Sequence, residues 1–336
     1  MSKASIALCG IGNWGKNLVK HFHELGALGG LCDRRPEVLA ALSKIYKGIA
    51  CTTSYEEILK NPAINAVAIA VPTPDHYSFA KKALLAGKNV FVEKPIALKI
   101  SHAQELCRVA RRKKLKLMVG HLLLYHPAIL KLKEIIQNRE LGELYYLYTQ
   151  RLNLGQVRKD ENAMWSLAPH DISVLLHLFS SKPVSISAHG HSYIQKSRGI
   201  EDVIFINFRF ADGRSAHIHL SWLDPHKVRR ITLVGSKKMV VFDDMEQIDK
   251  LRVFDKGVDH TKTNPSLISS LVLRVGGVHV PFVENIEPLK AECAHFVSCI
   301  ENNTEPRSNG KNGVEVLRIL EAASKSLKLG GKNVRL

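Results

Sequence analysis

Residues 5–20 read SIALCGIGNWGKNLVK, and this stretch decides the fold of the first part of the chain. An apolar run, Ser5–Cys9, leads into Gly10-Ile11-Gly12-Asn13-Trp14-Gly15, and a helix is predicted over Lys16–Leu25. Strand, GxGxxG and helix in this order form the context in which the motif binds a dinucleotide. Gly10 permits the tight turn, Gly12 lets a pyrophosphate approach the backbone, and Gly15 lets the helix pack on the strand. Asn13 and Trp14 lie where the helix N-terminus would offer N–H groups to the phosphates.

Asp33 is the predicted partner of the adenosine ribose. It follows the next apolar run, Leu28–Cys32, and lies 18 residues after Gly15. An acidic residue about 20 residues beyond the motif binds the ribose hydroxyls, and its charge would repel the 2′-phosphate of NADP. NAD is therefore the predicted cofactor. Arg34 and Arg35 keep NADP open, because an arginine can accommodate that phosphate.

Short apolar runs alternate with amphipathic stretches up to about residue 120, as in βαβ units around a parallel sheet. The predicted strands are Ser5–Cys9, Leu28–Cys32, Ala66–Val71, Asn89–Val92 and Lys116–Val119, and the predicted helices are Lys16–Leu25, Pro36–Lys44, Tyr55–Leu59, His76–Ala86 and Ser101–Arg112.

After Gly120 the pattern of predicted elements changes. Strands now follow one another without crossover helices, which indicates antiparallel pairing. Asp212-Gly213 is a hairpin signal between two of these strands. The predicted elements are helices over Pro127–Gln137 and Ile172–Phe179, strands over Leu144–Leu152, Val184–His189, Val203–Phe210, Ser215–Trp222, Arg230–Val234 and Met239–Phe242, an irregular loop or arm over residues 257–285, and closing helices over Pro288–Glu301 and Gly313–Leu329.

The predicted fold class is an α/β Rossmann domain plus an α+β domain with a mainly antiparallel open sheet. The expected domains are residues 1–120 for dinucleotide binding, residues 121–288 for substrate and oligomerisation, and residues 289–336 as C-terminal helices that pack back on the body. An antiparallel sheet without covering helices leaves one face to bury, so we expect a homodimer or homotetramer.

The net charge of +17 raises the question of nucleic-acid binding. The basic residues are mostly dispersed, and the densest cluster, Arg111–Lys114, has no aromatic residues interleaved as a base-stacking platform would. We predict no nucleic-acid partner. A basic surface would instead attract a small substrate that carries phosphates, such as a nucleotide sugar.

No apolar run approaches the length of a membrane span, so no membrane partner is expected. The six cysteines contain no CxxC pair, which favours reduced thiols and a cytoplasmic setting. His189-x-His191 and His217-x-His219 each place two histidines on one strand face, but no carboxylate or cysteine completes either set in sequence. We expect no metal site, and we interpret these histidines as part of a polar dimer face.

Loops that follow strand ends should face the cofactor, since ligands in such folds bind beyond the carboxyl ends of the strands. Pro72, Thr73 and His76 follow one predicted strand and are expected at the cofactor. Glu93-Lys94-Pro95 follows the next strand and would direct Lys94 toward the nicotinamide. His121 and Tyr125 come after the last strand of this region, where they could reach substrate or pack the domain junction.

These motifs, in their order and spacing, resemble the Gfo/Idh/MocA oxidoreductase family: GxGxxG near the N-terminus, Pro-Thr-Pro-Asp-His at 72–76 and Val-Glu-Lys-Pro at 92–95. The resemblance extends through residues 120–127, His170-Asp171 and residues 287–290, so it covers nearly the whole chain. It implies that Lys94 borders nicotinamide and substrate, and that His170, at the start of a helix in the second domain, is the acid or base. Many members carry an aspartate four residues before that histidine, where this chain has Ser166.

The implied chemistry is the oxidation of a secondary alcohol, which loses a hydride to nicotinamide and a proton to a base. An imidazole titrates near pH 6.5 and can accept that proton at His170. The charge of Lys94 would stabilise the developing alkoxide, or the lysine would take the proton itself if burial lowered its pKa.

Residues 150–171, with Asn162, Trp165 and Ala168-Pro169-His170-Asp171, are most similar to the branch of the family that acts on UDP-sugars. That branch oxidises the 3-hydroxyl of UDP-N-acetylglucosamine or its uronic acid, and Arg151 and Arg158 are candidate contacts of the diphosphate. Two alternatives stay open: a dehydrogenase of a free sugar, inositol or other polyol, and a non-catalytic NAD-binding regulatory protein, which Ser166 motivates.

Overall fold

The computed structural model describes residues 4–155, 157–261 and 270–336. Its contacts divide the chain into two compact units. Unit 1 consists of Met1–His126 and Ile286–Arg318, and unit 2 of Pro127–Asn285 and Ile319–Leu336. The C-terminal helices are thus divided between the two units, and each unit is described by itself below.

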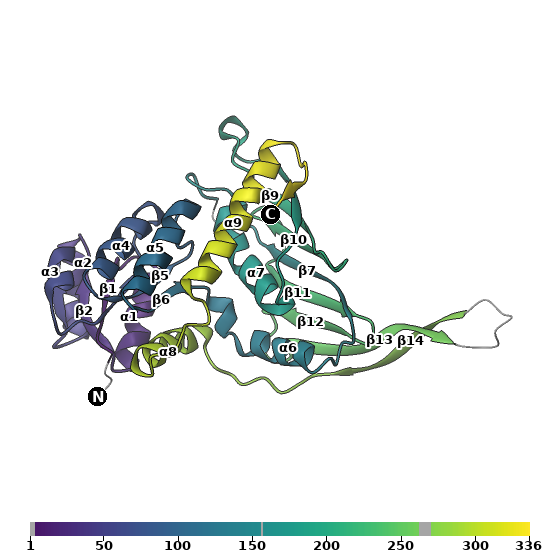
Figure 1. Cartoon of the computed structure of the whole chain (residues 1–336), viewed down its shortest axis with the longest axis horizontal. Helices are drawn as coiled ribbons and strands as arrows, with labels where there is room; N and C mark the ends of the chain where they lie inside the picture. Colours follow the sequence, from purple (N-terminus) through teal and green to yellow (C-terminus); the bar gives the residue numbers. More distant parts are fainter. Residues whose placement is uncertain (1–3, 156, 262–269) are drawn as a thin grey trace. The chain divides into compact units, whose positions relative to one another are not determined.

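In the described part of unit 1, six parallel strands form one sheet in the order β3-β2-β1-β4-β5-β6 (Figure 1). The strands are β1 Ile6–Cys9, β2 Leu28–Cys32, β3 Ala50–Thr52, β4 Ala66–Ile69, β5 Asn89–Glu93 and β6 Leu117–Gly120. The helices are α1 Gly15–Glu24, α2 Pro36–Ile45, α3 Tyr55–Lys60, α4 His76–Leu85, α5 Ile100–Arg112, α8 Pro288–Glu301 and the first part of α9 Gly310–Lys328, with short 3-10 turns η1 Thr73–Asp75 and η2 Leu122–Tyr125.

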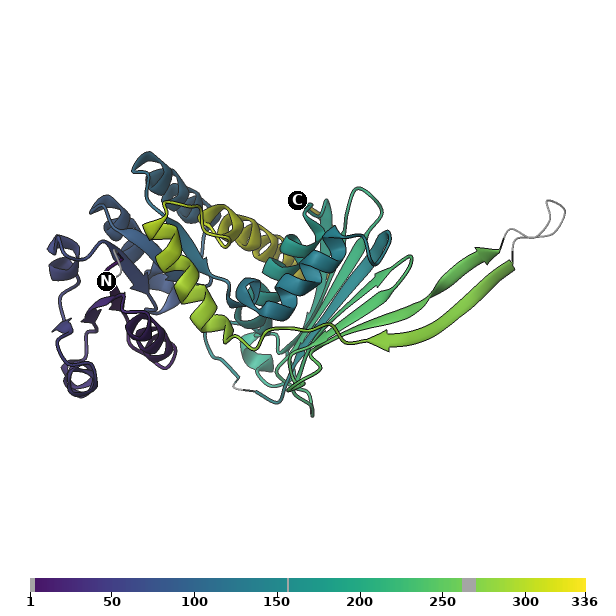
Figure 2. The same ribbon diagram turned by 90° about the horizontal axis from the view of Figure 1, so that it is seen from below.

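The core of unit 1 is the sheet itself, because strands β1, β4 and β6 are buried at every residue. Such strands need helices on both faces of the sheet. Helices α4 and α5 pack together on one face, and α1 and α8 pack together on the other (Figure 2). Since all six strands are parallel, the loops that follow them lie at one edge of the sheet, and this edge carries the glycine motif, Lys94 and His121.

In the described part of unit 2, nine strands form a sheet in the order β14-β13-β12-β11-β7-β10-β9-β8-β15. The strands are β7 Leu144–Leu152, β8 Ser185–His191, β9 Val203–Arg209, β10 Ser215–Ser221, β11 Val228–Gly235, β12 Met239–Asp243, β13 Leu251–Thr261, β14 Ser270–His279 and β15 Val334–Arg335. The helices are α6 Pro127–Gln137, α7 Ala163–Phe179 and the second part of α9, with a 3-10 turn η3 Lys196–Arg198.

One face of the unit 2 sheet is covered, and the other is open. Helices α6 and α7 lie on the covered face, with α7 against β7, β9 and β10 (Figure 1). Strands β8 and β9 alternate between buried and less buried residues, the period of a half-covered sheet. All neighbouring pairs in the described sheet are antiparallel except β7 with β10. The predicted fold class is therefore confirmed, and the Asp212-Gly213 turn joins β9 to β10 as expected.

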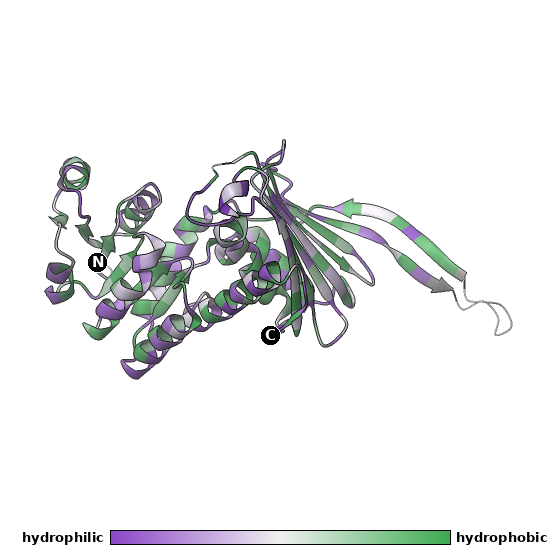
Figure 3. Ribbon diagram, turned by 90° about the horizontal axis from the view of Figure 1, so that it is seen from above, coloured by the Kyte–Doolittle hydropathy of each residue, from purple (hydrophilic) through white to green (hydrophobic). Residues whose placement is uncertain are grey.

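Two predictions about unit 2 are wrong. Residues 257–261 and 270–279 are not irregular, because they belong to the strands of a long hairpin, β13 and β14; residues 262–269 lie outside the described part. Gly257, Gly276 and Gly277 lie within these strands and weakened the strand signal, since glycine has no side chain to pack on a sheet. The hairpin extends beyond the other strands of unit 2, so the arm alternative is the one found (Figure 3).

Helix α7 also begins earlier than expected. It starts at Ala163 instead of Ile172, because the side chain of Asn162 accepts a hydrogen bond from Trp165 N at 3.1 Å and caps the helix. Pro169 lies inside the helix. His170 consequently lies in the middle of α7 and not at its start. Elsewhere in unit 1, the short and exposed strand β3 was not among the predicted strands.

Among the described residues, none of the helices combines the length and the hydropathy of a bilayer-crossing segment.

Candidate active site

The glycine motif forms a cradle whose shape only glycine permits. Gly10 has φ +88°, and a Cβ there would lie 2.7 Å from the backbone of Ala70. A Cβ on Gly15 would lie 2.1 Å from the carbonyl oxygen of Gly10. At Gly12, by contrast, no atom lies within 4 Å of such a Cβ, so this side of the loop is open. An approaching pyrophosphate would reach the backbone at Gly12, next to the first turn of α1, which contains no acidic residue.

Asp33 is buried at the end of β2 and holds this cradle in place. Its Oδ2 accepts a hydrogen bond from Ile11 N at 2.7 Å, and its Oδ1 accepts from Arg35 Nε at 2.9 Å. The Arg35 guanidinium lowers the pKa of Asp33 to about 2, so the carboxylate is ionised at every working pH. Arg34 is exposed and forms no salt bridge among the described residues. The open loop, the helix N-terminus and the carboxylate together fit the pyrophosphate and ribose of a dinucleotide.

The loop after β4 contains Pro72, Thr73 and His76. The imidazole of His76 is buried between two carbonyl oxygens: Nδ1 lies 2.7 Å from Pro95 O, and Nε2 lies 3.0 Å from Val71 O. Burial lowers the pKa of His76, so the ring is neutral and donates one of these bonds. His76 therefore ties its loop to the segment after Lys94, and its contact with a cofactor stays a prediction.

Glu93 joins the end of β5 to the glycine motif. Its carboxylate accepts a hydrogen bond from Trp14 Nε1 at 2.5 Å and another from Lys94 N at 3.2 Å. It packs against Gly120, where a Cβ would lie 2.9 Å from the carboxylate oxygens. Burial raises the pKa of Glu93 to about 7. The group is thus a carboxyl whose charge changes near neutral pH, in contact with two predicted cofactor residues.

Lys94 and His121 follow two paired residues of unit 1, because Glu93 of β5 pairs with Gly120 of β6 and each is followed by one of them. His121 is buried, and neither of its ring nitrogens has a hydrogen-bond partner among the residues that the structure describes. Burial lowers the pKa of His121 to about 3, with a further decrease from Lys94. A neutral imidazole with both nitrogens available is costly to bury without a partner. A ligand next to Lys94 would supply that partner.

Unlike the ring of His121, the hydroxyl of Tyr125 already has hydrogen-bond partners. Its hydroxyl lies 2.8 Å from Ser308 Oγ and accepts a hydrogen bond from Ser308 N at 3.2 Å. The ring is buried, with the Arg307 guanidinium 5.0 Å from its centre. Of the two roles expected for Tyr125, the structure supports packing and gives no support to a substrate contact.

Glu292 is a buried ionisable residue that is not among the predicted site residues. It lies on α8, and in the described part of the chain neither carboxylate oxygen has a hydrogen-bond partner. Burial raises the pKa of Glu292 well above its ordinary range, and the charge of Glu93 raises it further. Its position three residues after Leu289 and four before Phe296, on the apolar face of the helix, is the signal that could have identified it.

In unit 2, helix α7 carries His170 and Asp171. Asp171 is buried and forms an ion pair with Arg151, with Nε to Oδ2 at 2.7 Å and Nη2 to Oδ1 at 3.3 Å. Arg151 thus has a buried partner inside unit 2, and its contact with a diphosphate stays a prediction. His170 is partly exposed, and its backbone carbonyl accepts a hydrogen bond from Ser173 Oγ at 2.8 Å.

The other predicted substrate residues of unit 2 also have partners. Asn162 caps α7 and donates from Nδ2 to Glu201 Oε2 at 2.8 Å. Trp165 Nε1 donates to Ser324 Oγ at 3.1 Å. Arg158 pairs with Glu161 at 3.2 Å and keeps half of its side chain exposed. Arg158 is therefore the most accessible of these side chains.

The described residues contain no group of three histidine, cysteine or carboxylate side chains placed to hold a metal ion. On the unit 2 sheet, His217 Nδ1 lies 2.5 Å from Asn207 Oδ1, and His219 stacks on Phe205 at 4.3 Å.

Two models of one protein family match two consecutive parts of the chain. The family model described as "Oxidoreductase family, NAD-binding Rossmann fold" of Gfo/Idh/MocA matches residues 4–121, and the family's C-terminal domain model matches residues 129–241. Together the two models cover more than half of the chain.

Two curated relatives differ in what they act on. The chain is 29% identical over 182 residues to UDP-N-acetylglucosamine 3-dehydrogenase from Acidithiobacillus ferrooxidans, covering 54% of this chain and 56% of that protein. It is 24% identical over 307 residues to inositol 2-dehydrogenase from Rhizobium meliloti, covering 88% of each.

Solved structures share the fold at low identity. The same Acidithiobacillus enzyme aligns with a TM-score of 0.83 at 22% identity, over 97% of this chain and 98% of that one. A levoglucosan dehydrogenase in complex with NADH and levoglucosan aligns with a TM-score of 0.83 at 19% identity, over 99% of both chains. The chain belongs to the Gfo/Idh/MocA family of NAD-binding oxidoreductases.

Proposed function

We propose that this oxidoreductase uses NAD to oxidise the 3-hydroxyl of a UDP-N-acetyl amino sugar to the 3-keto sugar. The observation that carries the proposal is the pair of Lys94 and the unpartnered His121, at the same sheet edge as the glycine cradle. The relative that acts on UDP-N-acetylglucosamine and the net charge of +17 support a substrate with a diphosphate.

Bound NAD would accept the hydride from the sugar carbon. In unit 1, Lys94 would stabilise the oxygen of the alcohol as it loses its proton, and His121 would hydrogen-bond a substrate hydroxyl. In unit 2, His170 would accept the proton. Lys94 and His170 belong to different units, so their meeting at one substrate is part of the proposal. Glu93 would hold Trp14 and the backbone of Lys94 in place.

The second candidate is a dehydrogenase of a free sugar, inositol or other polyol. It is favoured by the inositol 2-dehydrogenase relative, whose alignment covers more of the chain than that of the UDP-sugar enzyme. Two predicted diphosphate or substrate contacts, Arg151 and Asn162, already have partners inside unit 2, which also suits a smaller substrate.

The third candidate is a regulatory protein that binds NAD without turnover. Ser166 motivates it, because many family members have an aspartate there. Asp171 is held by Arg151 and does not replace that aspartate in the structure.

The test measures NADH formation with UDP-N-acetylglucosamine, its uronic acid, free N-acetylglucosamine and myo-inositol. We expect turnover of the UDP-sugars only, and a decrease in kcat of roughly a hundredfold or more for Lys94→Met. Lys99→Met, an exposed lysine of the next turn, is the matched control and should keep full activity. Turnover of inositol alone would establish the second candidate. NAD-dependent thermal stabilisation without turnover would establish the third.

A cytoplasmic setting and a homo-oligomer are also proposed. The six free cysteines are consistent with a reducing compartment. The open face of the unit 2 sheet carries Tyr146 and Phe205, which are 38% and 43% exposed, and so provides apolar surface for a second copy.

A further inference from the structure

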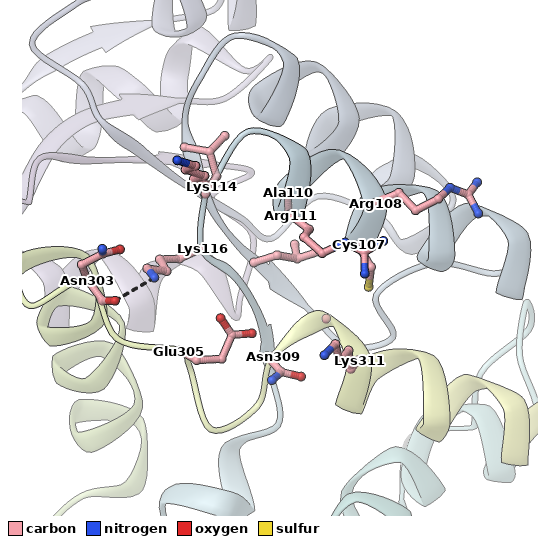
Figure 4. A pocket seen from close by; sticks show the side chains of 13 residues that line it. Cys107, Arg108, Ala110, Arg111, Lys114, Lys116, Asn303, Glu305, Asn309 and Lys311 are labelled. Atoms are coloured by element: carbon pink, nitrogen blue, oxygen red, sulfur yellow. Dashed lines mark hydrogen bonds between the residues drawn. The ribbon is translucent and has the colours of Figure 1, made fainter.

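Unit 1 contains a cavity of about 550 Å³ away from the glycine cradle. It lies between the end of α5, the turn into β6 and the segment that leads into α9 (Figure 4). Its lining consists of Cys107, Arg108, Ala110, Arg111, Lys114, Leu115, Lys116, Leu117, Asn303, Glu305, Asn309, Gly310 and Lys311.

The cavity is strongly positive. Five of its lining residues are cationic, Arg108, Arg111, Lys114, Lys116 and Lys311, and a single carboxylate, Glu305, lines it as well. Within the described chain none of the five cations enters a salt bridge, although nearby Lys81 pairs with Glu105 at 2.8 Å. Since these five cations outnumber the single carboxylate of the lining, the cavity keeps an excess of positive charge.

Cations from α5, Arg108 and Arg111, line the cavity together with Lys311 of α9 and the Cys107 thiol. Burial raises the pKa of Cys107 to about 11; the charges of Lys311, Arg108 and Arg111 oppose this shift, and the charge of Glu305 adds to it. Lys116 Nζ lies on the other side, where it donates to Asn303 O at 3.0 Å (Figure 4).

The start of α9 forms part of the wall. A Cβ on Gly310 would lie 2.7 Å from Leu117 Cδ2 and 2.8 Å from Cys107 Sγ, so glycine allows the helix to begin here. Asn309 caps it by accepting from Asn312 N at 3.1 Å. The N-terminal end of this 19-residue helix adds positive potential to that of the side chains. Buried Ala110 and Leu117 add an apolar surface.

The cavity lies at the opposite edge of the sheet from the cofactor loops. Leu117 is the first residue of β6, and His121 follows its last residue. The four residue steps from Leu117 to His121 separate the two places by about 13 Å along the strand. A ligand in the cavity would leave the dinucleotide site open.

We propose that this cavity binds a small polyphosphate anion of the nucleoside polyphosphate class, at a site separate from that of NAD. Its volume lies within the range of small-molecule sites. The excess of cations in the lining matches a phosphate chain, and the apolar surface beside them matches a sugar or base. This inference does not depend on which sugar the enzyme oxidises.

The experiment titrates ATP and, separately, inorganic tripolyphosphate into the full-length protein that is already saturated with NAD, by calorimetry. We expect ATP to bind, and the double variant Arg111→Glu with Lys311→Glu to bind it at least tenfold more weakly. Raising the salt concentration should weaken binding further, since exposed charges are screened. Binding of tripolyphosphate as well would show that the phosphate chain suffices, and ATP binding alone would show that the nucleoside contributes.

The matched control is Lys47→Glu with Lys60→Glu, two exposed lysines of unit 1 outside the cavity with the same change in net charge. It should bind ATP within twofold of the parent. Both variants must keep the thermal stabilisation by NAD, which reports folded unit 1. Equal loss in both double variants, or no ATP binding once NAD is saturating, would overturn the proposal. Binding of duplex DNA but of neither small anion would overturn it too.

Discussion

A single carboxylate, that of Asp33, fixes the position of both Ile11 and Arg35. It accepts from the Ile11 and Arg35 amides and from the Arg35 guanidinium, all within 3.0 Å. Because Arg35 neutralises the carboxylate, a 2′-phosphate would meet less repulsion here than at an unpaired aspartate. We therefore expect the preference between NAD and NADP to depend on the Asp33–Arg35 pair and not on Asp33 alone.

Replacing Asp33 with serine should release Arg35 toward a 2′-phosphate, beside the exposed Arg34. We expect Asp33→Ser to increase the affinity for NADP relative to NAD by roughly tenfold or more. Dissociation constants for both cofactors, measured by fluorescence titration, give the ratio. Glu56→Ser removes an exposed carboxylate of α3, which pairs with Lys82, and should leave the ratio unchanged. An unchanged ratio in Asp33→Ser would remove Asp33 from the cofactor site.

Glu93 and Glu292 make stability depend on pH. A carboxyl whose pKa is raised by folding contributes stability below its unfolded pKa of about 4.3, and this contribution is lost as pH rises through the folded value. For Glu93 the folded value is about 7. The window of loss therefore runs from about pH 4.3 to about pH 7 for Glu93, and the shift of Glu292 has the same direction.

Glu292→Gln should reduce this loss. Because the amide carries no charge, the variant should be more stable than the parent at pH 8 by roughly 1–3 kcal/mol, with a smaller difference at pH 5. Urea unfolding at both pH values measures the free energies. Glu284→Gln, at an exposed position, is the control and should follow the parent. A parent and a Glu292→Gln variant with the same pH profile would contradict the assignment.

Local sequence predicts the shape of the glycine cradle, because this shape depends on the backbone of the motif itself. The glycines and Asp33 act through the turn and the amides beside them, and these depend on the motif itself. Glu292 could not be paired with Glu93 from sequence, since almost 200 residues separate them. Arg151 was expected at a substrate, but its partner Asp171 is set by packing of β7 against α7.

At the scale of elements, one capping residue, Asn162, determines where helix α7 begins. Asn162 accepts from Trp165 N and donates to Glu201, so it fixes the first turn on two sides. We expect Asn162→Ala to decrease the free energy of unfolding of unit 2 by about 1–2 kcal/mol. Asn138→Ala, an exposed asparagine after α6, should change it by less than about 0.5 kcal/mol. Equal effects from both would show that the cap contributes little.

Elements with a strong periodic pattern were predicted from sequence with their bounds. Helices α6 and α8 and strand β7 begin and end at the expected residues, because their apolar residues recur at the period of the element. Strand β3 and the hairpin of β13 and β14 were missed. The first is short and mostly exposed, and the second contains glycines, so neither carries that pattern.

At the scale of the whole molecule, the open sheet face predicts self-association. We expect the protein to have at least the mass of a dimer in light scattering, and Phe205→Glu to reduce that mass, since a charge on this face would be desolvated. Phe282→Glu changes a side chain that is 84% exposed outside the strands and should leave the mass unchanged. A monomeric parent protein would contradict the expected oligomer.

The hairpin of β13 and β14 has a consequence for how the protein can be observed. Among the described strands, β12 pairs with residues 251–254 of β13 and no strand pairs with the outer part of the hairpin, so residues 256–261 and 270–275 form a two-stranded ribbon. Such ribbons are marginal in water. If the ribbon remains exposed, its amide protons will exchange with deuterium within seconds at any dilution. Slow exchange that becomes fast on dilution would instead show that a second copy covers the ribbon. The exchange rate of these amides would then report how long the assembly stays together.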